Sequence, residues 1–164
     1  MGDEEAFGRY VIDSYAVLVR RAMLLVGDRG HAEDLVQASL ARAYPRWRRI
    51  VQPDAYLRTV MVRTAMGWRA RRWNGELPTD PLPDTPSPTD VLAGSDLSAA
   101  VRAALMSLPA EQRAVVVLRY FDDCSEAEIA AALGCSAGTV KSRASRALAS
   151  LRSNGLLAEE GQLR

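Results

Sequence analysis

Cysteine and histidine are scarce in this sequence, whose 164 residues include two cysteines, Cys124 and Cys135, and one histidine, His31. These three residues cannot complete the usual four-ligand zinc site, and no C-x-x-C pair is present. We expect two small, partly buried thiols in a reducing compartment, and a histidine at the surface near a helix start. A glycine-rich phosphate loop is also missing. The sequence therefore predicts no metal site, no cofactor, no small-molecule substrate and no enzymatic activity.

Long hydrophobic runs are missing as well. The longest apolar stretches, such as Ala22–Val26 and Ala114–Leu118, are far shorter than the roughly 20 residues that a membrane-spanning helix needs. The chain does not open with a charged and then apolar secretory leader. We therefore expect a cytoplasmic protein that does not contact membranes.

Signals for β-strands are nearly absent. Val115-Val116-Val117 is the only β-branched run in the sequence, and helical patterns flank it on both sides. Elsewhere the apolar residues recur at steps of three and four, as on one face of a helix. This pattern predicts an all-α fold.

Charge is unevenly distributed, although the formal net charge is only +1. Residues 1–75 carry 13 arginines against 8 acids, residues 76–98 carry 5 acids and no base, and residues 99–164 carry 8 bases against 7 acids.

The stretch from Asn74 to Gly94 has five prolines and no apolar period, so it cannot bury enough surface to offset the entropy of ordering it. We predict a helical domain at 1–73, a flexible acidic linker at 74–95, a second helical domain at 96–155 and a tail at 156–164.

The first domain should begin with two amphipathic helices. The first is expected to end near Gly27, and the second to start around residues 30–32 with Asp28 as its cap. Glu33 and Asp34 are expected in the first turn, where acidic side chains complement the helix dipole. The apolar faces of the two helices are formed by Phe7, Val11, Tyr15, Leu18, Ala22 and Leu25, and by Ala32, Leu35, Ser39 and Ala43.

Prolines mark the next helix boundaries. Pro45 should kink or end the second helix, Pro53 fits the first position of a third, and Pro109 opens a helix in the second domain. Ser95 or Asp96 is expected to cap the helix before it. The apolar faces of these helices are formed by Leu57, Val60, Met61, Thr64, Ala65 and Trp68, by Leu97, Val101 and Leu105, and by Ala114, Val117, Leu118 and Phe121.

The stretch SEAEIAAALGCSAGTVKSRASRAL, residues 125–148, has the pattern of a helix-turn-helix. Ser125 and Glu128 fit a capping box at the start of the first helix. Gly134 supplies the left-handed backbone that ends this helix, and Ser136 caps the second. The buried face of the first helix is expected to consist of Ile129, Ala130 and Leu133.

The second of these helices has an apolar face and a polar face. The apolar face is formed by Val140, which should fill the helix crossing, and by Ala144, Ala147, Leu148 and Leu151. The polar face is formed by Thr139, Lys141, Ser142, Arg143, Ser145 and Arg146. In helix-turn-helix proteins the second helix enters the DNA major groove, where long cations meet phosphates and guanine acceptors. We therefore predict DNA binding by this face. The alternative, a merely solvated helix face, leaves unexplained why the acids Glu126 and Glu128 lie on the first helix and none on the second.

Three motifs, in the same order along the chain, resemble the sigma-70 family of RNA polymerase factors. The segment LPAEQRAVVVLRYFDDCSEAEIAAALGCSAGTVKSRASRALASLR is similar to sigma domain 4, which reads the −35 promoter element. AEDLVQASLARAYPRW resembles the domain 2 helix that binds the coiled coil of the polymerase β′ subunit, and DAYLRTVMVRTAMGWRARR resembles the adjoining helix that handles the −10 element. Two lobes and a short linker match the extracytoplasmic-function (ECF) group, with a particular likeness to SigE-like factors of high-GC bacteria.

The resemblance implies three sets of site residues. Polymerase binding is implied for Asp34, Leu35, Gln37 and Ala38. Contacts to the −10 element are implied for Arg63, Thr64, Trp68, Arg69 and Arg72, and the Trp47–Pro53 segment matches a loop that captures a flipped base. Base reading at −35 is implied for Lys141, Ser142, Ser145 and Arg146, and phosphate or groove contacts for Thr139, Arg143 and, more weakly, Arg113. Trp68 also lies on an apolar face, so a core role and a base contact both stay open.

The function that the resemblance implies is to direct core RNA polymerase to promoters. The first lobe would bind β′ and the −10 element, the second the β flap and the −35 element, and polymerase would supply the catalysis. An anti-sigma factor is a further partner in this group. The acidic linker is either a solvated spacer or a polyanion mimic in the basic RNA exit channel of polymerase. The residues alone leave two alternatives open, an autonomous helix-turn-helix regulator and a sigma-like decoy or adaptor.

Overall fold

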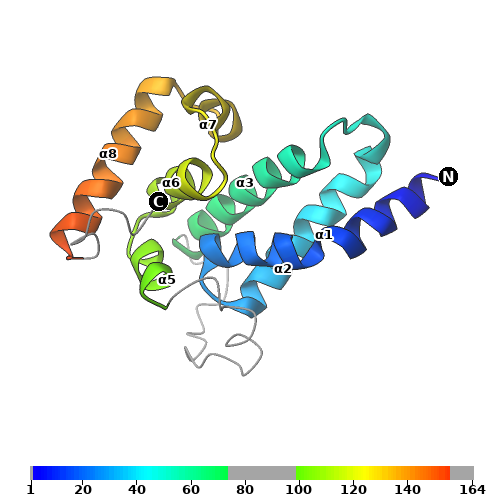
Figure 1. The fold of residues 1–164 in the computed structure, drawn as a ribbon, viewed down its shortest axis with the longest axis horizontal. Coiled ribbons are helices and arrows are strands. Elements are labelled where there is room, and N and C mark those ends of the chain that lie inside the picture. Colours follow the sequence, from blue (N-terminus) through cyan, green and yellow to red (C-terminus); the bar gives the residue numbers. More distant parts are fainter. Residues whose placement is uncertain (1, 74–98, 156–164) are drawn as a thin grey trace. The chain divides into compact units, whose positions relative to one another are not determined.

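The computed structural model describes residues 2–73 and 99–155, and all regular structure in these two ranges is helical (Figure 1). The all-α prediction is therefore confirmed for the described part. The chain divides into two compact units, one within Met1–Asp96 and one within Leu97–Arg164. The predicted linker at 74–95, the caps at Ser95 or Asp96, Leu97 and the tail at 156–164 lie outside the described residues, so the domain boundaries stay predictions.

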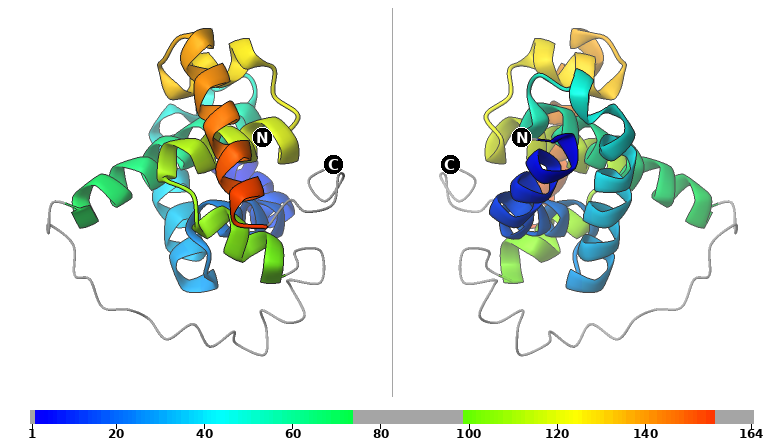
Figure 2. Two further views of the ribbon diagram at one scale, coloured as in Figure 1. Left: turned by 90° about the vertical axis from the view of Figure 1, so that its left-hand side faces the viewer. Right: turned by 90° about the vertical axis from the view of Figure 1, so that its right-hand side faces the viewer.

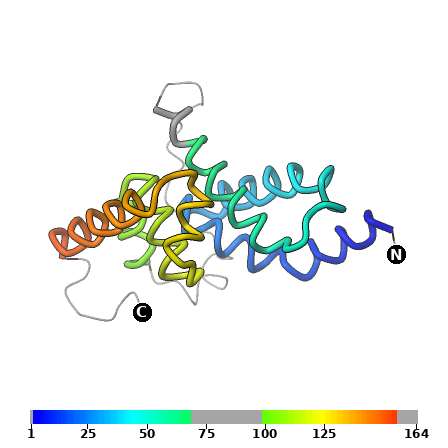
Figure 3. The backbone as a smooth tube through the Cα atoms, turned by 90° about the horizontal axis from the view of Figure 1, so that it is seen from above, coloured from blue at the N-terminus to red at the C-terminus, as the bar shows by residue number. Residues whose placement is uncertain are grey.

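In its described residues, 2–73, unit 1 has three α-helices and a 3₁₀ turn. These elements are α1 (Asp3–Val26), α2 (Arg29–Ala43), η1 (Tyr44–Arg49) and α3 (Pro53–Trp73). The chain runs in one direction along α1, returns along α2 and turns back along α3 (Figure 3). Helix α2 packs against both α1 and α3. The core of unit 1 is formed by Leu18, Ala22, Leu25, Leu35, Val36, Leu57, Met61 and Val62, among others.

The junction between α1 and α2 follows the predicted caps. Gly27 ends α1 in the left-handed region at φ 89°, and the Asp28 carboxylate accepts a hydrogen bond from the His31 amide at 2.9 Å. The His31 ring, half-buried near this helix start, also contacts the Asp28 carboxylate. Because α2 already begins at Arg29, Glu33 and Asp34 lie beyond its first turn, and their predicted placement there was wrong. Glu33 instead accepts a hydrogen bond from Arg29 Nε at 2.9 Å, one helical turn away.

The proline boundaries of unit 1 are confirmed. The α-helical geometry of α2 stops at Ala43, and Pro45 lies in the first turn of η1. Pro53 begins α3. Of the six residues predicted for the apolar face of α3, Leu57, Met61 and Thr64 are buried, whereas the other three are half-buried. Val62, which the sequence analysis left out of this face, is buried as well.

Between residues 99 and 155, unit 2 has four α-helices and one turn of π-helix. These elements are α5 (Ala99–Met106), α6 (Ala110–Val116), the π segment η2 (Val117–Phe121), α7 (Glu126–Leu133) and α8 (Ala137–Ser153). Helix α8 packs against α6 and α7 (Figure 2). The β-branched run Val115–Val117 is helical, as predicted, and all three side chains are buried. The buried run Arg113–Leu118, at the end of α6 and the start of η2, belongs to the core of unit 2.

Arg113 has a structural role that the sequence did not reveal. The family resemblance suggested a phosphate contact, but the residue is only 7% exposed. Its guanidinium donates hydrogen bonds to the carbonyls of Leu105 and Leu108, both at 2.8 Å, and more weakly to that of Met106 at 3.4 Å. Leu105 and Met106 lie in the last turn of α5 and Leu108 follows it, where backbone acceptors lack their usual partners within the helix. Arg113 therefore joins α6 to the end of α5, and we correct its assignment as a phosphate contact.

Replacing Arg113 should destabilise unit 2. Arg113→Met keeps most of the aliphatic stem but removes the guanidinium that donates to the Leu105 and Leu108 carbonyls, which should cost about 2–4 kcal/mol of unfolding free energy. Urea denaturation followed by circular dichroism measures this loss. Arg152→Met, an exposed arginine on α8, is the matched control and should change the free energy little. Equal effects of the two substitutions would show that the buried hydrogen bonds contribute nothing.

Candidate nucleic-acid interface

The turn between α7 and α8 forms through the local interactions that the sequence predicted. Ser125 Oγ accepts from the Glu128 amide and Glu128 Oε1 accepts from the Ser125 amide, both at 3.1 Å, which completes the capping box. Gly134 ends α7 at φ 66°, in the left-handed region that glycine adopts without strain. Ser136 Oγ then accepts from the Thr139 amide at 3.1 Å and caps α8. The helix-turn-helix prediction is therefore confirmed in each of its caps.

The two faces of α8 differ in burial as predicted. Val140, Ala144, Ala147 and Leu151 are buried, and Leu148 is half-buried. Lys141, Ser142, Ser145 and Arg146 are exposed on the other side of the helix. The four exposed residues supply cations and hydroxyls, which are the groups that contact phosphates and base edges in a major groove.

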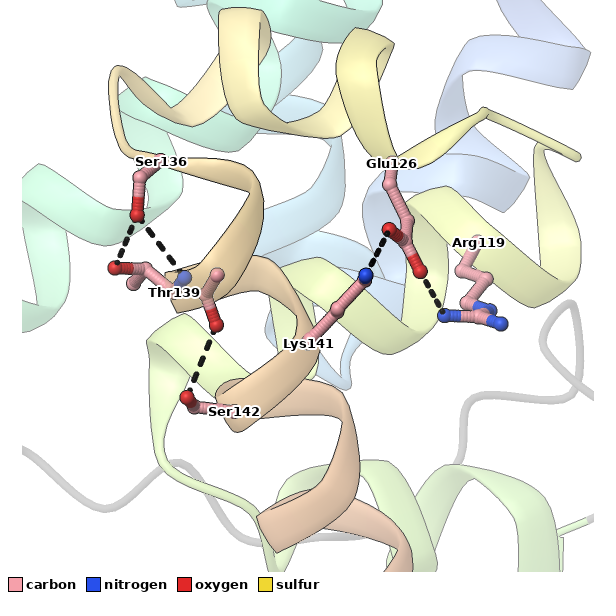
Figure 4. Close-up of polar contacts among 7 residues, drawn as sticks. Arg119, Glu126, Ser136, Thr139, Lys141 and Ser142 are labelled. Carbon is pink, nitrogen blue, oxygen red and sulfur yellow. Dashed lines mark hydrogen bonds and ion pairs between the residues drawn. The ribbon is translucent and has the colours of Figure 1, made fainter.

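Two residues of the predicted polar face are only half-exposed. Arg143 lies against the turn, with Nη1 3.9 Å from Cys135 Sγ. Thr139 Oγ1 lies 3.0 Å from Ser136 Oγ at the start of the helix. Ser142 Oγ, on the exposed face, donates to the Gly138 carbonyl at 3.0 Å (Figure 4). Thr139 and Arg143, for which the resemblance implies phosphate or groove contacts, thus lie at the edge of the exposed face.

A carboxylate of α7 reaches the exposed face of α8, a contact that the sequence did not predict. Glu126 Oε2 lies 3.8 Å from Lys141 Nζ, and Glu126 Oε1 lies 3.5 Å from Arg119 Nη1 (Figure 4). The sequence placed an acid at residue 126 but gave no sign that its partners would come from two other elements. Only the packing of η2, α7 and α8 brings these three side chains together.

Unit 1 contains two neighbouring pockets at the start of α3. A pocket of about 460 Å³ is lined by Arg46, Arg49, Ile50, Val51, Gln52 and Tyr56. A second of about 650 Å³ is lined by Arg42, Pro45, Arg46, Tyr56, Thr59, Val60 and Arg63. Four lining residues of the first pocket, Arg49, Ile50, Val51 and Gln52, belong to the Trp47–Pro53 segment that the family resemblance matched to a base-capturing loop. Sequence reasoning missed Arg46 and Tyr56, which line both pockets.

An aromatic cluster holds this loop against α1. The Phe7 ring lies 5.0 Å from that of Tyr44 and 5.1 Å from that of Trp47, and the Tyr10 ring lies 5.1 Å from Trp47. Tyr10 also donates a hydrogen bond to Asp54 at 2.7 Å. Burial of the Tyr10 ring and this bond raise the pKa of Tyr10, so the hydroxyl stays protonated and donates at neutral pH. Trp47 is therefore part of the support behind the pocket, while Val51 at the pocket's edge is 92% exposed.

The side chains assigned to the −10 element by resemblance are not equally accessible. Arg63 is exposed and lines the second pocket. Thr64 is 4% exposed, and its Oγ1 accepts from Arg42 Nη1 at 3.2 Å, so α3 would have to move away from α2 before DNA could reach it. Trp68 is half-buried, which fits either of its two readings. Arg69 and Arg72 belong to α3, but their side chains lie outside what the structure describes.

The residues assigned to polymerase binding also differ in how far they are exposed. Asp34 and Gln37 are exposed on α2, and Ala38 is half-buried. Leu35 is 0% exposed, because it lies on the same helix face as Ala32, Ser39 and Ala43, which pack into the core. The structure corrects the prediction that Leu35 contacts polymerase: its side chain packs into the core of unit 1 and does not reach the surface of α2.

The described part of the chain has no feature of a metal site or of a membrane span. No group of three or more histidine, cysteine or acidic side chains gathers within residues 2–73 and 99–155. In the same residues, no helix combines the length and the apolar character that crossing a bilayer requires. Cys124 is buried and Cys135 half-buried, and the two are not joined in a disulfide.

Comparison with known proteins matches both units. The family description "Sigma-70 region 2" matches residues 11–74, and "Sigma-70, region 4" matches residues 98–151. The RNA polymerase sigma-E factor of Streptomyces coelicolor is 44% identical over 155 residues, which cover 93% of this chain and 87% of that protein. The chain belongs to the ECF sigma factors.

Further relatives of this sigma factor agree with that assignment. The ECF RNA polymerase sigma factor SigL of Mycobacterium tuberculosis is 37% identical over 158 residues, covering 91% of this chain and 89% of that one. Among solved structures, the sigma factor RpoE of Bartonella quintana, in complex with the anti-sigma factor NepR, has a TM-score of 0.67 at 26% identity. That match covers 95% of this chain and 99% of the other. The region 2 match contains both pockets, and the region 4 match contains the helix-turn-helix.

The support behind the first pocket can be tested through Tyr10. Tyr10→Phe removes the hydrogen bond to Asp54 but keeps the ring, and should lower the stability of unit 1 by about 1 kcal/mol. Hydrogen exchange at the Ile50 amide, which donates to the Trp47 carbonyl at 3.2 Å within the loop, should become faster. Tyr15→Phe on the same helix is the control. Unchanged exchange at Ile50 in Tyr10→Phe would show that the loop is held without this bond.

Proposed function

We propose that this sigma factor is a dissociable promoter-specificity subunit of RNA polymerase, in which α8 reads the −35 element and the pockets of unit 1 hold the −10 element. The observation that carries the proposal is the exposed set Lys141, Ser142, Ser145 and Arg146 on a helix whose other face is buried. In helix-turn-helix proteins the recognition helix enters the major groove, and arginine or lysine there pairs with the acceptors of guanine. Thr139 and Arg143, at the edge of this face, would contact phosphates or the groove wall.

The pockets of unit 1 suit an unpaired base. Arg46 and Arg49 offer cations beside the apolar Ile50 and Val51 and the ring of Tyr56. Single-stranded nucleic acid is bound by this combination of stacking surfaces and cations. Arg63 lies along the neighbouring pocket and can contact the backbone of the same strand. The family resemblance also implies −10 contacts for Trp68, Arg69 and Arg72, which belong to α3.

Core polymerase would bind unit 1 through the exposed part of α2. Asp34 and Gln37 present a charge and an amide on this surface, and Leu35 anchors the helix from the core side. The β′ coiled coil is the proposed partner there, and the β flap is the proposed partner of unit 2. In this role the chain is not an enzyme, because polymerase supplies the catalysis. It would act in the cytoplasm, where polymerase and promoter DNA are found.

An anti-sigma factor is a further proposed partner. The Bartonella quintana RpoE was solved in complex with the anti-sigma factor NepR, and that chain shares the fold over nearly its whole length. A protein partner of this kind would compete with polymerase for the sigma factor and keep it inactive until a signal releases it.

The −35 contact can be tested by replacing Arg146 with alanine. If Arg146 pairs with a base edge, run-off transcription with core polymerase should fall about 5- to 150-fold, as expected for the loss of 1–3 kcal/mol. Binding to core, measured by pull-down, should not change. The control Arg152→Ala removes an exposed arginine from the same helix, outside the predicted face, and should transcribe nearly as well as the wild type.

Two outcomes would contradict the proposal. If the wild-type chain does not bind core polymerase, or gives no specific transcripts with it, the chain is not a working promoter-specificity subunit. Tight, sequence-specific binding to DNA by the chain alone, measured by gel shift without polymerase, would instead indicate an autonomous regulator.

A further inference from the structure

A hydrogen bond between Arg42 and Thr64 joins the two helices that border the second pocket of unit 1. Arg42 lies in the last turn of α2, and its Nη1 donates to the Oγ1 of Thr64 on α3 at 3.2 Å. Arg42 is exposed and lines the pocket, whereas Thr64 is 4% exposed. The bond therefore links a buried hydroxyl to a cation at the pocket wall.

The second pocket is suited to an anion. Arg42, Arg46 and Arg63 line it, and no acidic side chain does. Within the described residues of unit 1, 2–73, no carboxylate forms an ion pair with Arg42. The first pocket, which shares Arg46 and Tyr56 with the second, is the one proposed to hold an unpaired base. Because a base is attached to its backbone, the phosphates of the same strand pass close to that pocket, and they are the anions that the arginines attract.

The bond to Thr64 does not have to open when Arg42 binds a phosphate. A guanidinium has five N–H donors, and the hydroxyl accepts from one of them. A hydroxyl carries no net charge, so it does not neutralise the cation. Arg42 can therefore keep Thr64 as a partner while its other N–H groups donate to phosphate oxygens.

The bond lowers the entropy that Arg42 loses on binding. An arginine side chain that moves freely in solvent must be ordered when it contacts a ligand, and this ordering weakens binding. Thr64 is β-branched and buried, so its hydroxyl has a fixed position before DNA arrives. A bond to this hydroxyl restricts Arg42 to orientations at the pocket wall, and part of the ordering then takes place on folding.

The alternative is that the bond serves only to join α2 to α3. These helices already pack against each other, and both carry fully buried apolar side chains. Arg42 is exposed, so water can replace the hydroxyl as its partner, and the bond contributes little to stability. A cation in the last turn of a helix favours the helix dipole wherever its side chain points. The dipole therefore accounts for an arginine at this position but not for its orientation toward Thr64.

We infer that Arg42 contacts a backbone phosphate of the strand held by the pockets of unit 1, and that Thr64 is the positioning residue that keeps Arg42 at the pocket wall. The inference rests on the proposed function, because it takes these pockets to bind the opened −10 element. It deepens that function by adding Arg42, which the sequence analysis did not assign, and by giving Thr64 a role that is compatible with its burial. A phosphate contact carries no sequence information, so the pair should strengthen binding to all sequences alike.

The test measures DNA binding by holoenzyme assembled from core polymerase and the full chain. The probe is a promoter fragment that the wild type selects from a randomised library, with its −10 element held open by mismatches. Arg42→Gln should weaken binding at least about tenfold, because a charged hydrogen bond is lost. It should also make the slope of log affinity against log salt shallower by about 0.7, the value for one phosphate of a single strand. Thr64→Val should weaken binding about two- to tenfold with nearly the same slope, since the charge remains and only its ordering is lost.

Neutral backbone linkages in the probe locate the contact. Methylphosphonate, placed at one position of the opened strand at a time, removes the negative charge of a single phosphate. At one position the substitution should weaken binding by the wild type but not by Arg42→Gln. Base preference over the −10 element, measured by selection from the randomised library, should be the same in Arg42→Gln as in the wild type.

Three further variants separate positioning from a structural effect. Arg20→Gln removes an exposed arginine of α1 that lines neither pocket, and should leave affinity and salt slope unchanged. Thr64→Ser keeps the acceptor and should bind like the wild type. In the Arg42→Gln background, Thr64→Val should have no further effect, because the side chain that it positions is absent. Circular dichroism and pull-down with core check that each variant folds and assembles.

The outcomes separate this inference from the proposed function. If the wild-type holoenzyme binds the opened probe no better than the fully paired one, both are overturned. If it prefers the opened probe but Arg42→Gln behaves like Arg20→Gln, the inference alone is wrong. Altered base preference in Arg42→Gln would overturn the phosphate contact in favour of a base contact. Thr64 has no positioning role if Thr64→Val binds like the wild type, or if its effect persists without Arg42.

Discussion

The burial of the apolar face of α8 is the interaction on which the exposed polar face of this helix depends. Val140, Ala144, Ala147 and Leu151 pack against α6 and α7, and this contact fixes the rotation of α8 about its own axis. Because a helix turns by about 100° per residue, the same rotation directs Lys141 and the other polar residues outward. Burying one face therefore determines the other, and no separate interaction is needed to expose the cations.

In unit 1, aromatic side chains of α1 support the segment that lines the first pocket. A pocket beside a short 3₁₀ turn needs support, because such turns have few hydrogen bonds of their own. Phe7 and Tyr10 of α1 supply that support by packing on Trp47, and the bond from Tyr10 to Asp54 ties the start of α3 to the same cluster. Arg48 of η1 also forms an ion pair with Asp3, the first residue of α1. The segment that contains the pocket arginines Arg46 and Arg49 is thus packed against α1 through these aromatic contacts.

The parts of the fold that were predictable from sequence are those set by neighbouring residues. The capping box at Ser125, the left-handed Gly134 and the start of α3 at Pro53 depend on one turn of chain, and all three were found correctly. Apart from the placement of Glu33 and Asp34 in the first turn of α2, the errors concern contacts between elements. Arg113 looks like a surface cation until α5 brings its carbonyls alongside, and Glu126 looks like an ordinary helix-start acid until η2 and α8 pack beside it. Family likeness had the same limit at Leu35, where the motif names a helix but burial decides which of its residues reach the surface.

The selectivity of this sigma factor depends on the balance between weak contacts. One recognition helix with a few exposed polar side chains buries a modest area on DNA, and phosphate contacts favour all sequences equally. Adding cations to α8 would raise affinity for every duplex and so reduce the relative weight of base reading. The Glu126 carboxylate beside Lys141 opposes any contact of that cation with DNA, whether to a phosphate or to a base edge. The near-neutral charge of residues 99–164, 8 bases against 7 acids, is consistent with a DNA-binding unit that obtains its affinity through polymerase and keeps its own contacts selective.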